Sequence, residues 1–339
     1  MYTPISHQRQ HRYLYRGVKA TLITSMLIML SYCTEHTPPS DSFEVARKGV
    51  YGGAMSADAR FSIVGSIFDG GSLWRNTDAE RIYNWNHDKG GEKILLFASI
   101  EPDNQWALTA DDATLVIWDM DTGAAARFWT APGEILATTL GTGGRYALLG
   151  LADHSAVMFD AMRGGIVRTF THEGRVRSVD MSADRRLAIT GSEDKTAKVW
   201  RVESGELLIT GYYQEDVQLV KISPDGRYAI MAAQFDQVEL WDIQQRKSLG
   251  MIPISKEKLK RGLRVSSARF SNDNRYLLLG YPQRKVELWK TQPLERVKAW
   301  TLPKRQQWQP TNAAAIDVAF ETNKRFWTMS SDGFIHLLL

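Results

Sequence analysis

The chain has 339 residues, of which 43% are hydrophobic, 24% are charged and 10% are aromatic. This balance excludes an intrinsically disordered chain and is typical of a globular protein. The formal net charge of +4 is carried by Arg9, Arg12, Arg16 and Lys19, because no acidic residue precedes position 33 and the rest of the chain is neutral. The basic isoelectric point is therefore no evidence for nucleic-acid binding.

Residues 1–32 are predicted to be a signal peptide of the lipoprotein type. A basic segment ending at Lys19 is followed by an apolar run over residues 20–30, which is too short to cross a bilayer as a helix. The run ends in Leu30-Ser31-Tyr32-Cys33, which resembles the lipobox of bacterial lipoproteins, although Tyr32 stands where that family usually has Gly, Ala or Ser. An ordinary cleaved signal peptide and an uncleaved signal anchor are the alternatives.

Cys33 is the only cysteine, so the chain cannot form an internal disulfide. The resemblance implies that Cys33 is lipidated and becomes the new N-terminus, and that Thr34, which is not Asp, favours sorting to the outer membrane. Residues 33–42, rich in Thr, Pro and Ser, are predicted to be a flexible tether. We therefore expect a protein of the bacterial cell envelope that is held at the outer membrane by lipid and faces the periplasm.

A sequence unit recurs seven times between residues 43 and 339. In its best-formed copy, residues 186–190 and 196–200 read as strands on either side of a turn at Ser192–Lys195. The hydrophobic residue that closes each copy recurs every 41 to 49 residues, at Trp74, Trp118, Phe159, Trp200, Trp241, Trp289 and Leu338. This period, with four short strands per copy, predicts an all-β, seven-bladed β-propeller with four-stranded antiparallel blades.

The last copy stops at its third strand, over residues 334–338. The missing fourth strand is predicted at about residues 43–47, so that the N-terminal strand joins the last blade and closes the ring. Closure of this kind removes exposed strand edges, which would otherwise pair with other chains. We expect a single monomeric propeller over residues 43–339.

The repeats resemble the WD40-repeat family, with Trp-Asp pairs at Trp118-Asp119 and Trp241-Asp242. In that family a His, a Ser or Thr, an Asp and the Trp form a buried hydrogen-bonded tetrad that stabilises a blade. The resemblance implies such tetrads in two copies, formed by His172, Thr190, Asp194 and Trp200 in copy four and by His87, Thr109, Asp112 and Trp118 in copy two. A Thr-His-Asp catalytic triad is the competing interpretation, and the recurrence of the group in two copies favours the structural role.

Two connections are longer than the others, at residues 255–264 and 303–310. Both join the fourth strand of one blade to the first strand of the next, so they are predicted to emerge on the same face. They carry the candidate partner-binding residues Lys256, Lys258, Lys260, Arg261, Arg264, Lys304, Arg305 and Trp308. An acidic protein, anionic lipid headgroups or an acidic polysaccharide would suit this basic surface, and solvated loops without a partner are the alternative.

The expected function is that of a non-catalytic platform for protein–protein interaction. No glycine-rich phosphate loop and no metal-ligand spacing is present, so neither a cofactor nor a metal is predicted, and an exported protein is not expected to bind nucleic acid. The alternative is a propeller enzyme or ligand-binding protein that uses the central channel, where the first strands offer Arg177, Asp180 and Lys221. A structural subunit of an envelope complex is the third possibility.

Overall fold

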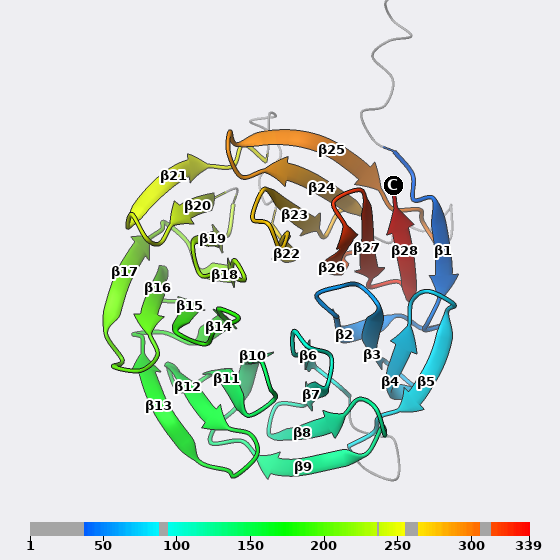
Figure 1. Ribbon diagram of the computed structural model, residues 1–339, viewed down its shortest axis with the longest axis horizontal. Coiled ribbons are helices and arrows are strands. Elements are labelled where there is room, and N and C mark those ends of the chain that lie inside the picture. The colour runs from blue at the N-terminus through cyan, green and yellow to red at the C-terminus, as the bar shows by residue number, and fades with distance from the viewer. Residues whose placement is uncertain (1–36, 88–93, 236, 255–263, 306–312) are drawn as a thin grey trace, which may run out of the picture. The chain divides into compact units, whose positions relative to one another are not determined.

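The computed structural model describes residues 37–87, 94–235, 237–254, 264–305 and 313–339. In these ranges the chain forms seven four-stranded antiparallel sheets arranged in a ring (Figure 1), and their first strands line a central channel. All the strands belong to the unit Pro38–Leu339. The predicted all-β fold with seven four-stranded blades is confirmed.

The blades follow the chain in order, and each runs from the channel outwards (Figure 1). The first four blades consist of β2 (Val50–Met55), β3 (Phe61–Ser66), β4 (Gly70–Arg75) and β5 (Glu80–Asn84); β6 (Phe97–Ile100), β7 (Trp106–Ala110), β8 (Thr114–Asp119) and β9 (Ala125–Thr130); β10 (Ile135–Leu140), β11 (Tyr146–Leu151), β12 (Ser155–Asp160) and β13 (Ile166–Thr171); and β14 (Val176–Met181), β15 (Leu187–Ser192), β16 (Thr196–Arg201) and β17 (Leu207–Tyr212).

Blades 5 and 6 repeat this order, and blade 7 differs because its outer strand comes from the other end of the chain. The three blades consist of β18 (Val217–Ile222), β19 (Tyr228–Ala233), β20 (Val238–Asp242) and β21 (Lys247–Met251); β22 (Ser267–Phe270), β23 (Tyr276–Tyr281), β24 (Lys285–Lys290) and β25 (Glu295–Thr301); and β26 (Ala315–Thr322), β27 (Arg325–Ser330), β28 (Phe334–Leu338) and β1 (Asp41–Glu44).

A Ser-x-Asp sequence forms the turn between the first and second strands in four blades. In blade 4, Ser182 Oγ donates to Asp184 Oδ1 at 2.6 Å, and the same oxygen accepts the Arg186 N–H at 3.0 Å. Arg185, which lies between Asp184 and Arg186, takes a left-handed conformation with φ of 60°. These local bonds satisfy backbone donors that no strand can reach, which explains why the motif recurs before the second strand in these four blades.

The hydrophobic core lies between neighbouring blades. One cluster, for example, combines Ile189 and Val199 of blade 4 with Val217, Val220 and Met231 of blade 5, and all five side chains are buried. Each blade is therefore held mainly by its two neighbours, and a blade without a neighbour on one side would expose an apolar sheet face to water.

Ring closure involves a strand slightly earlier than the predicted residues 43–47. β1 covers Asp41–Glu44 and pairs antiparallel with β28, from Asp41 opposite Leu337 to Glu44 opposite Phe334. The predicted closure, in which an N-terminal strand completes the last blade, is confirmed. The strand lies two to three residues before the approximate bounds, because its pairing with β28 ends opposite Phe334, where β28 begins. Asp41 and Ser42, which were predicted to belong to the tether, are part of the sheet.

Side chains on both sides of β1 hold it in place. The Phe43 ring lies 6.4 Å, centroid to centroid, from the indoles of both Trp74 and Trp327. Arg305 donates to Asp332 O at 2.7 Å and to Ala46 O at 3.1 Å, and it forms an ion pair with Glu44. The N-terminal strand thus contacts blade 1, blade 7 and the connection after blade 6.

The antiparallel order gives the ring two distinct faces. One face, which we call the connection face, carries the connections from the fourth strand of one blade to the first strand of the next. It also carries the turns between second and third strands. Turns between first and second strands, and between third and fourth strands, lie on the other, which we call the turn face. This division follows from strand direction alone, because successive antiparallel strands end on alternate faces.

Candidate functional site

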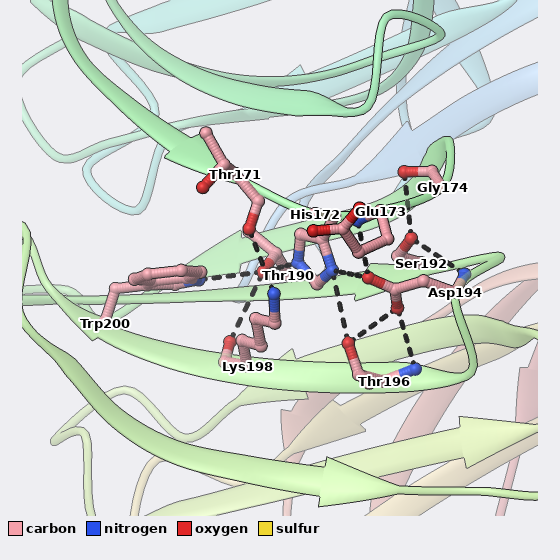
Figure 2. Close-up of polar contacts among 10 residues, drawn as sticks. All are labelled: Thr171, His172, Glu173, Gly174, Thr190, Ser192, Asp194, Thr196, Lys198 and Trp200. Carbon is pink, nitrogen blue, oxygen red and sulfur yellow. Dashed lines mark hydrogen bonds and ion pairs between the residues drawn. The ribbon is translucent and has the colours of Figure 1, made fainter.

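The best-formed group of polar side chains lies inside blade 4 (Figure 2). Trp200 Nε1 donates to Thr190 Oγ1 at 2.9 Å, the His172 Nε2 atom lies 2.7 Å from the same hydroxyl, and His172 Nδ1 lies 2.8 Å from Asp194 Oδ2. One arrangement of protons satisfies all three hydrogen bonds. The Nδ1–H of His172 donates to Asp194, and the Thr190 hydroxyl accepts from Trp200 while it donates to Nε2 of His172.

The charges in this group follow from its burial. Burial lowers the pKa of His172, although the Asp194 carboxylate partly offsets the effect. Burial would raise the pKa of Asp194, but hydrogen bonds from the Thr196 hydroxyl, the Glu173 N–H and His172 lower that pKa to about 2. The group at neutral pH is therefore a neutral imidazole next to a carboxylate. Thr190 and the His172 side chain are fully buried, so an external substrate could not reach this hydroxyl.

The corresponding group in blade 2 contains a different aspartate from the predicted one. His87 Nε2 lies 2.8 Å from Thr109 Oγ1, and Trp118 Nε1 donates to the same atom at 2.7 Å. The carboxylate near the imidazole belongs to Asp111, whose Oδ2 is 3.7 Å from His87 Nδ1, whereas Asp112 is exposed. Four residues separate the last paired residues Ala110 and Leu115 in blade 2, whereas five separate Gly191 and Ala197 in blade 4. Because of this difference, the carboxylate that faces the histidine in blade 2 belongs to Asp111 and not to Asp112.

Blades 5 and 6 have no such histidine, and in them a glutamate accepts the indole N–H in place of the threonine hydroxyl. In blade 6, Glu287 is fully buried and accepts from Trp289 Nε1 at 3.0 Å and from the Tyr281 hydroxyl at 2.7 Å. Its carboxylate also forms ion pairs with Lys285 and Arg296. Burial would raise the pKa of Glu287, but these donors, Lys285 foremost, hold it below its usual value.

Blade 5 repeats this arrangement with Glu239. Its carboxylate accepts from Trp241 Nε1 at 2.7 Å and from the Tyr213 hydroxyl at 2.8 Å. Neither glutamate was predicted from the sequence, although a signal was present: Val-Glu-Leu-Trp occurs in both copies, and residues two apart on a strand lie on the same face.

Blade 7 contains a buried histidine that joins the ring-closing strand to the blade. His336 Nδ1 lies 2.7 Å from Ser42 Oγ on β1, and Nε2 lies 3.0 Å from Ser330 Oγ on β27. The side chain is fully buried, and burial lowers its pKa to about 4. Sequence analysis did not connect His336 with the tetrads, because its partners lie on β1 and β27.

Acid is therefore expected to destabilise ring closure before the carboxylates titrate. An unfolded histidine takes up a proton near pH 6.5, whereas folded His336 does so only near pH 4. Its contribution to stability is complete above pH 6.5 and declines as the pH falls towards 4, by about 3 kcal/mol in all. Urea denaturation between pH 7 and 4 should show this decline, and His336→Gln should make it shallower. An equally steep decline in His336→Gln would contradict this role.

The predicted partner-binding residues are only partly described by the structure. Lys256, Lys258, Lys260, Arg261 and Trp308 lie outside the described residues. Of the other three, Arg264 donates to Gln234 Oε1 at 3.3 Å, Lys304 is exposed, and Arg305 is engaged in the closure contacts. Arg305 was thus predicted for a partner, but most of its hydrogen-bonding capacity is used within the chain.

A second candidate site is the central channel, a cavity of about 480 Å³ lined by the first strand of every blade. The predicted channel residues Arg177, Asp180 and Lys221 all line it, and so do Arg269 and Asp317, which sequence analysis did not single out. Lys221 Nζ lies 3.6 Å from Asp180 Oδ1, and Arg269 Nη2 lies 2.9 Å from Asp317 Oδ2.

Both carboxylates of the channel also join neighbouring blades. Asp180 Oδ2 accepts the N–H of Ile222 at 3.0 Å, and Asp317 Oδ2 accepts that of Met55 at 2.8 Å. In blade 2, Ser99 Oγ does the same for the N–H of Leu140 at 3.0 Å. These first-strand side chains therefore have a structural role in addition to any role they have towards a ligand.

Neither a metal site nor a membrane-spanning helix is present in the part of the chain that the structure describes. There, no three His, Cys, Asp or Glu side chains come together in a way that could hold a metal ion. The same ranges contain no helix that is long and apolar enough to cross a membrane.

Comparison with known families identifies the unit from which the ring is built. Residues 164–201 match the WD40 family model, described as WD domain, G-beta repeat. The matched segment contains β13, the outer strand of blade 3, and ends with β16, so the sequence repeat is offset by one strand from the structural blade. No curated protein matches the chain. The matched repeat and the seven four-stranded blades together support the WD40 propeller family for this chain.

Proposed function

We propose that the protein is a non-catalytic platform for protein–protein interaction in the bacterial cell envelope. It is exported, lipidated at Cys33 and held at the outer membrane, with the propeller in the periplasm. WD40 propellers are commonly protein-interaction scaffolds, and a rigid ring offers a partner a large surface at little cost in ordering. The observation that carries the proposal is the direction in which the chain enters the ring.

That direction follows from the pairing of β1. Asp41 lies opposite Leu337, at the end of β28 on the turn face, and Glu44 lies opposite Phe334, which follows a turn on the connection face. The chain therefore enters β1 at its turn-face end. Cys33 is eight residues earlier, a reach of at most about 28 Å. A lipid on Cys33 would keep the turn face nearer the membrane and leave the connection face open to partners.

The connection face also carries most of the exposed aromatic side chains among the described residues. Tyr51, at the start of β2, is 60% exposed, and Tyr212, at the end of β17, is 81% exposed. Phe68 and Phe235 lie in turns between second and third strands and are 72% and 48% exposed. Aromatic side chains at a surface often contribute most of the binding energy of an interface. With the lysines and arginines of the long connections, they suit an acidic protein partner.

Charge reversal on the connection face tests this proposal. Replacement of Lys258, Lys260, Arg261 and Lys304 by Glu should remove the proteins that crosslink to and copurify with the propeller from intact cells. The control has the same charge change on the turn face, where Arg163, Arg246, Lys247 and Lys324 are exposed. An unchanged set of copurifying proteins in the first variant would reject the connection face as the platform.

Two other functions fit parts of the same structure. A propeller enzyme or ligand-binding protein would use the central channel, whose charged lining is the observation in its favour. A structural subunit of an envelope complex would use the same connection face and differ only in the permanence of its partner. Nucleic acid is not a partner in this proposal, because an exported protein does not meet it.

A further inference from the structure

The charges that line the central channel are confined to one side of it. Blades 4 to 7 contribute all five charged lining residues, whereas the lining residues of blades 1 to 3 carry no charge and include Ala54, Ala98 and Leu136. The channel thus has one charged wall, opposite an uncharged wall in which small and apolar side chains lie beside the hydroxyl groups of Ser99, Thr138 and Thr139. Cations outnumber carboxylates in this lining by three to two: Arg177, Lys221 and Arg269 against Asp180 and Asp317.

Two of the cations are neighbours with no carboxylate between them. Lys221 and Arg269 occupy equivalent positions on the first strands β18 and β22 of adjacent blades, since each pairs with the third residue of its second strand. Their acidic partners lie on the outer sides of this pair, Asp180 in blade 4 and Asp317 in blade 7. Like charges side by side in a cavity with low-dielectric walls create a positive potential that favours an anion between them.

Lys221 has most of its hydrogen-bonding capacity left. Its Nζ lies 3.6 Å from Asp180 Oδ1, beyond hydrogen-bond distance, and within the described residues the structure gives its ammonium group no hydrogen bond. Arg269 uses Nη2 for Asp317 and for Met55 O, both at 2.9 Å. Both side chains remain partly exposed in the channel, at 33% for Lys221 and 25% for Arg269.

We propose that the central channel binds a small organic anion that has an apolar body. Its carboxylate, phosphate or sulfonate group lies between Lys221 and Arg269, and its apolar body lies against the uncharged wall around Ala54, Ala98 and Leu136. A cavity of about 480 Å³ has the size of known small-molecule sites, which combine apolar walls with a few placed polar groups. This site is independent of the protein platform proposed for the connection face.

Calorimetric titration of the full chain with 2-naphthoate tests the proposal. Its control ligands are 2-naphthamide, which keeps the apolar body without the charge, and inorganic phosphate, which has charge without the body. The expected result is one naphthoate site per chain, with each control ligand weaker by about tenfold or more. Lys221→Met should weaken naphthoate binding to a similar degree while the melting temperature changes little. Its ammonium group makes no hydrogen bond within the described residues, and its 3.6 Å ion pair with Asp180 is partly exposed and contributes little stability.

The matched control is Lys247→Met, which removes an exposed lysine from β21 on the outside of blade 5 and should leave binding unchanged. Arg269→Gln should also weaken binding, although it can lower stability through the lost bond to Met55 O. Three outcomes would overturn the proposal: no naphthoate binding at about 5 mM, equal binding of naphthamide, or naphthoate binding that Lys221→Met does not weaken.

Discussion

Removal of strand β1 is expected to lower the free energy of unfolding by about 5 kcal/mol or more, which is comparable to the whole stability of many domains. A variant that begins at Val45 loses the pairing of Asp41–Glu44 with β28. It also loses the packing of Phe43 on two tryptophans and the contact between Ser42 and His336. The unpaired edge of β28 would in addition be free to pair with another chain.

Urea denaturation and size-exclusion chromatography measure this effect. The control begins at Ser40 and keeps β1, so the two variants differ only by the five residues 40–44. The shorter variant should unfold at a much lower urea concentration and form dimers or aggregates. Equal urea midpoints for the two would show that β1 does not close the ring.

Glu287→Gln is expected to destabilise the protein by about 3 kcal/mol. The substitution keeps the shape of the side chain but removes the buried negative charge that pairs with Lys285 and Arg296, and loss of one partner of a buried ion pair is costly. The expected loss of stability lies at the lower end of the range of about 3 to 5 kcal/mol for buried ion pairs, because both cations are about one-quarter exposed and can reach water. Glu295→Gln in the same blade, which removes an exposed ion pair with Lys290, is the control and should cost at most about 0.5 kcal/mol.

Acid should narrow the difference between the parent protein and Glu287→Gln. The pKa of Glu287 is held below its usual value, so its carboxylate stabilises the folded state above pH 4.5, and this contribution is lost as the pH falls through the lowered pKa. The Gln variant has no such loss. Denaturation curves that differ by the same amount at pH 7 and at pH 3 would exclude a carboxylate effect.

The architecture could be predicted from the sequence because each blade repeats one pattern of burial. The tryptophan or other apolar residue that closes each third strand packs in the same interblade layer, so its spacing alone counts the blades. Details that depend on one residue of register were less predictable. The choice of Asp111 over Asp112 in blade 2 depends on the length of one turn, and the start of β1 at Asp41 depends on where its pairing with β28 begins. The repeat pattern specifies neither of these local features, so the sequence did not predict them.

The two glutamates that were not predicted take the place of the hydroxyl group that the WD40 pattern led us to expect. Glu239 and Glu287 accept the indole N–H that a hydroxyl accepts elsewhere, and they do so from the same strand as the tryptophan. Arg269 and Asp317 are similar cases in the channel. Arg269 is equivalent to Lys221 by register, but it belongs to a copy of 48 residues, whose longer connection obscures this. Asp317, in the copy of 49 residues, pairs with Met329 and so occupies the position of Ser178 and not that of Asp180.

Site-specific photocrosslinking in intact cells tests the central claim, that the closed ring presents its connection face to a protein partner. A photoreactive amino acid is placed either at Tyr212, which is 81% exposed on the connection face, or at Lys324, which is exposed in a turn on the opposite face. A discrete crosslinked protein from position 212, absent from position 324, is the predicted result. A crosslinked protein from position 324 alone would contradict it.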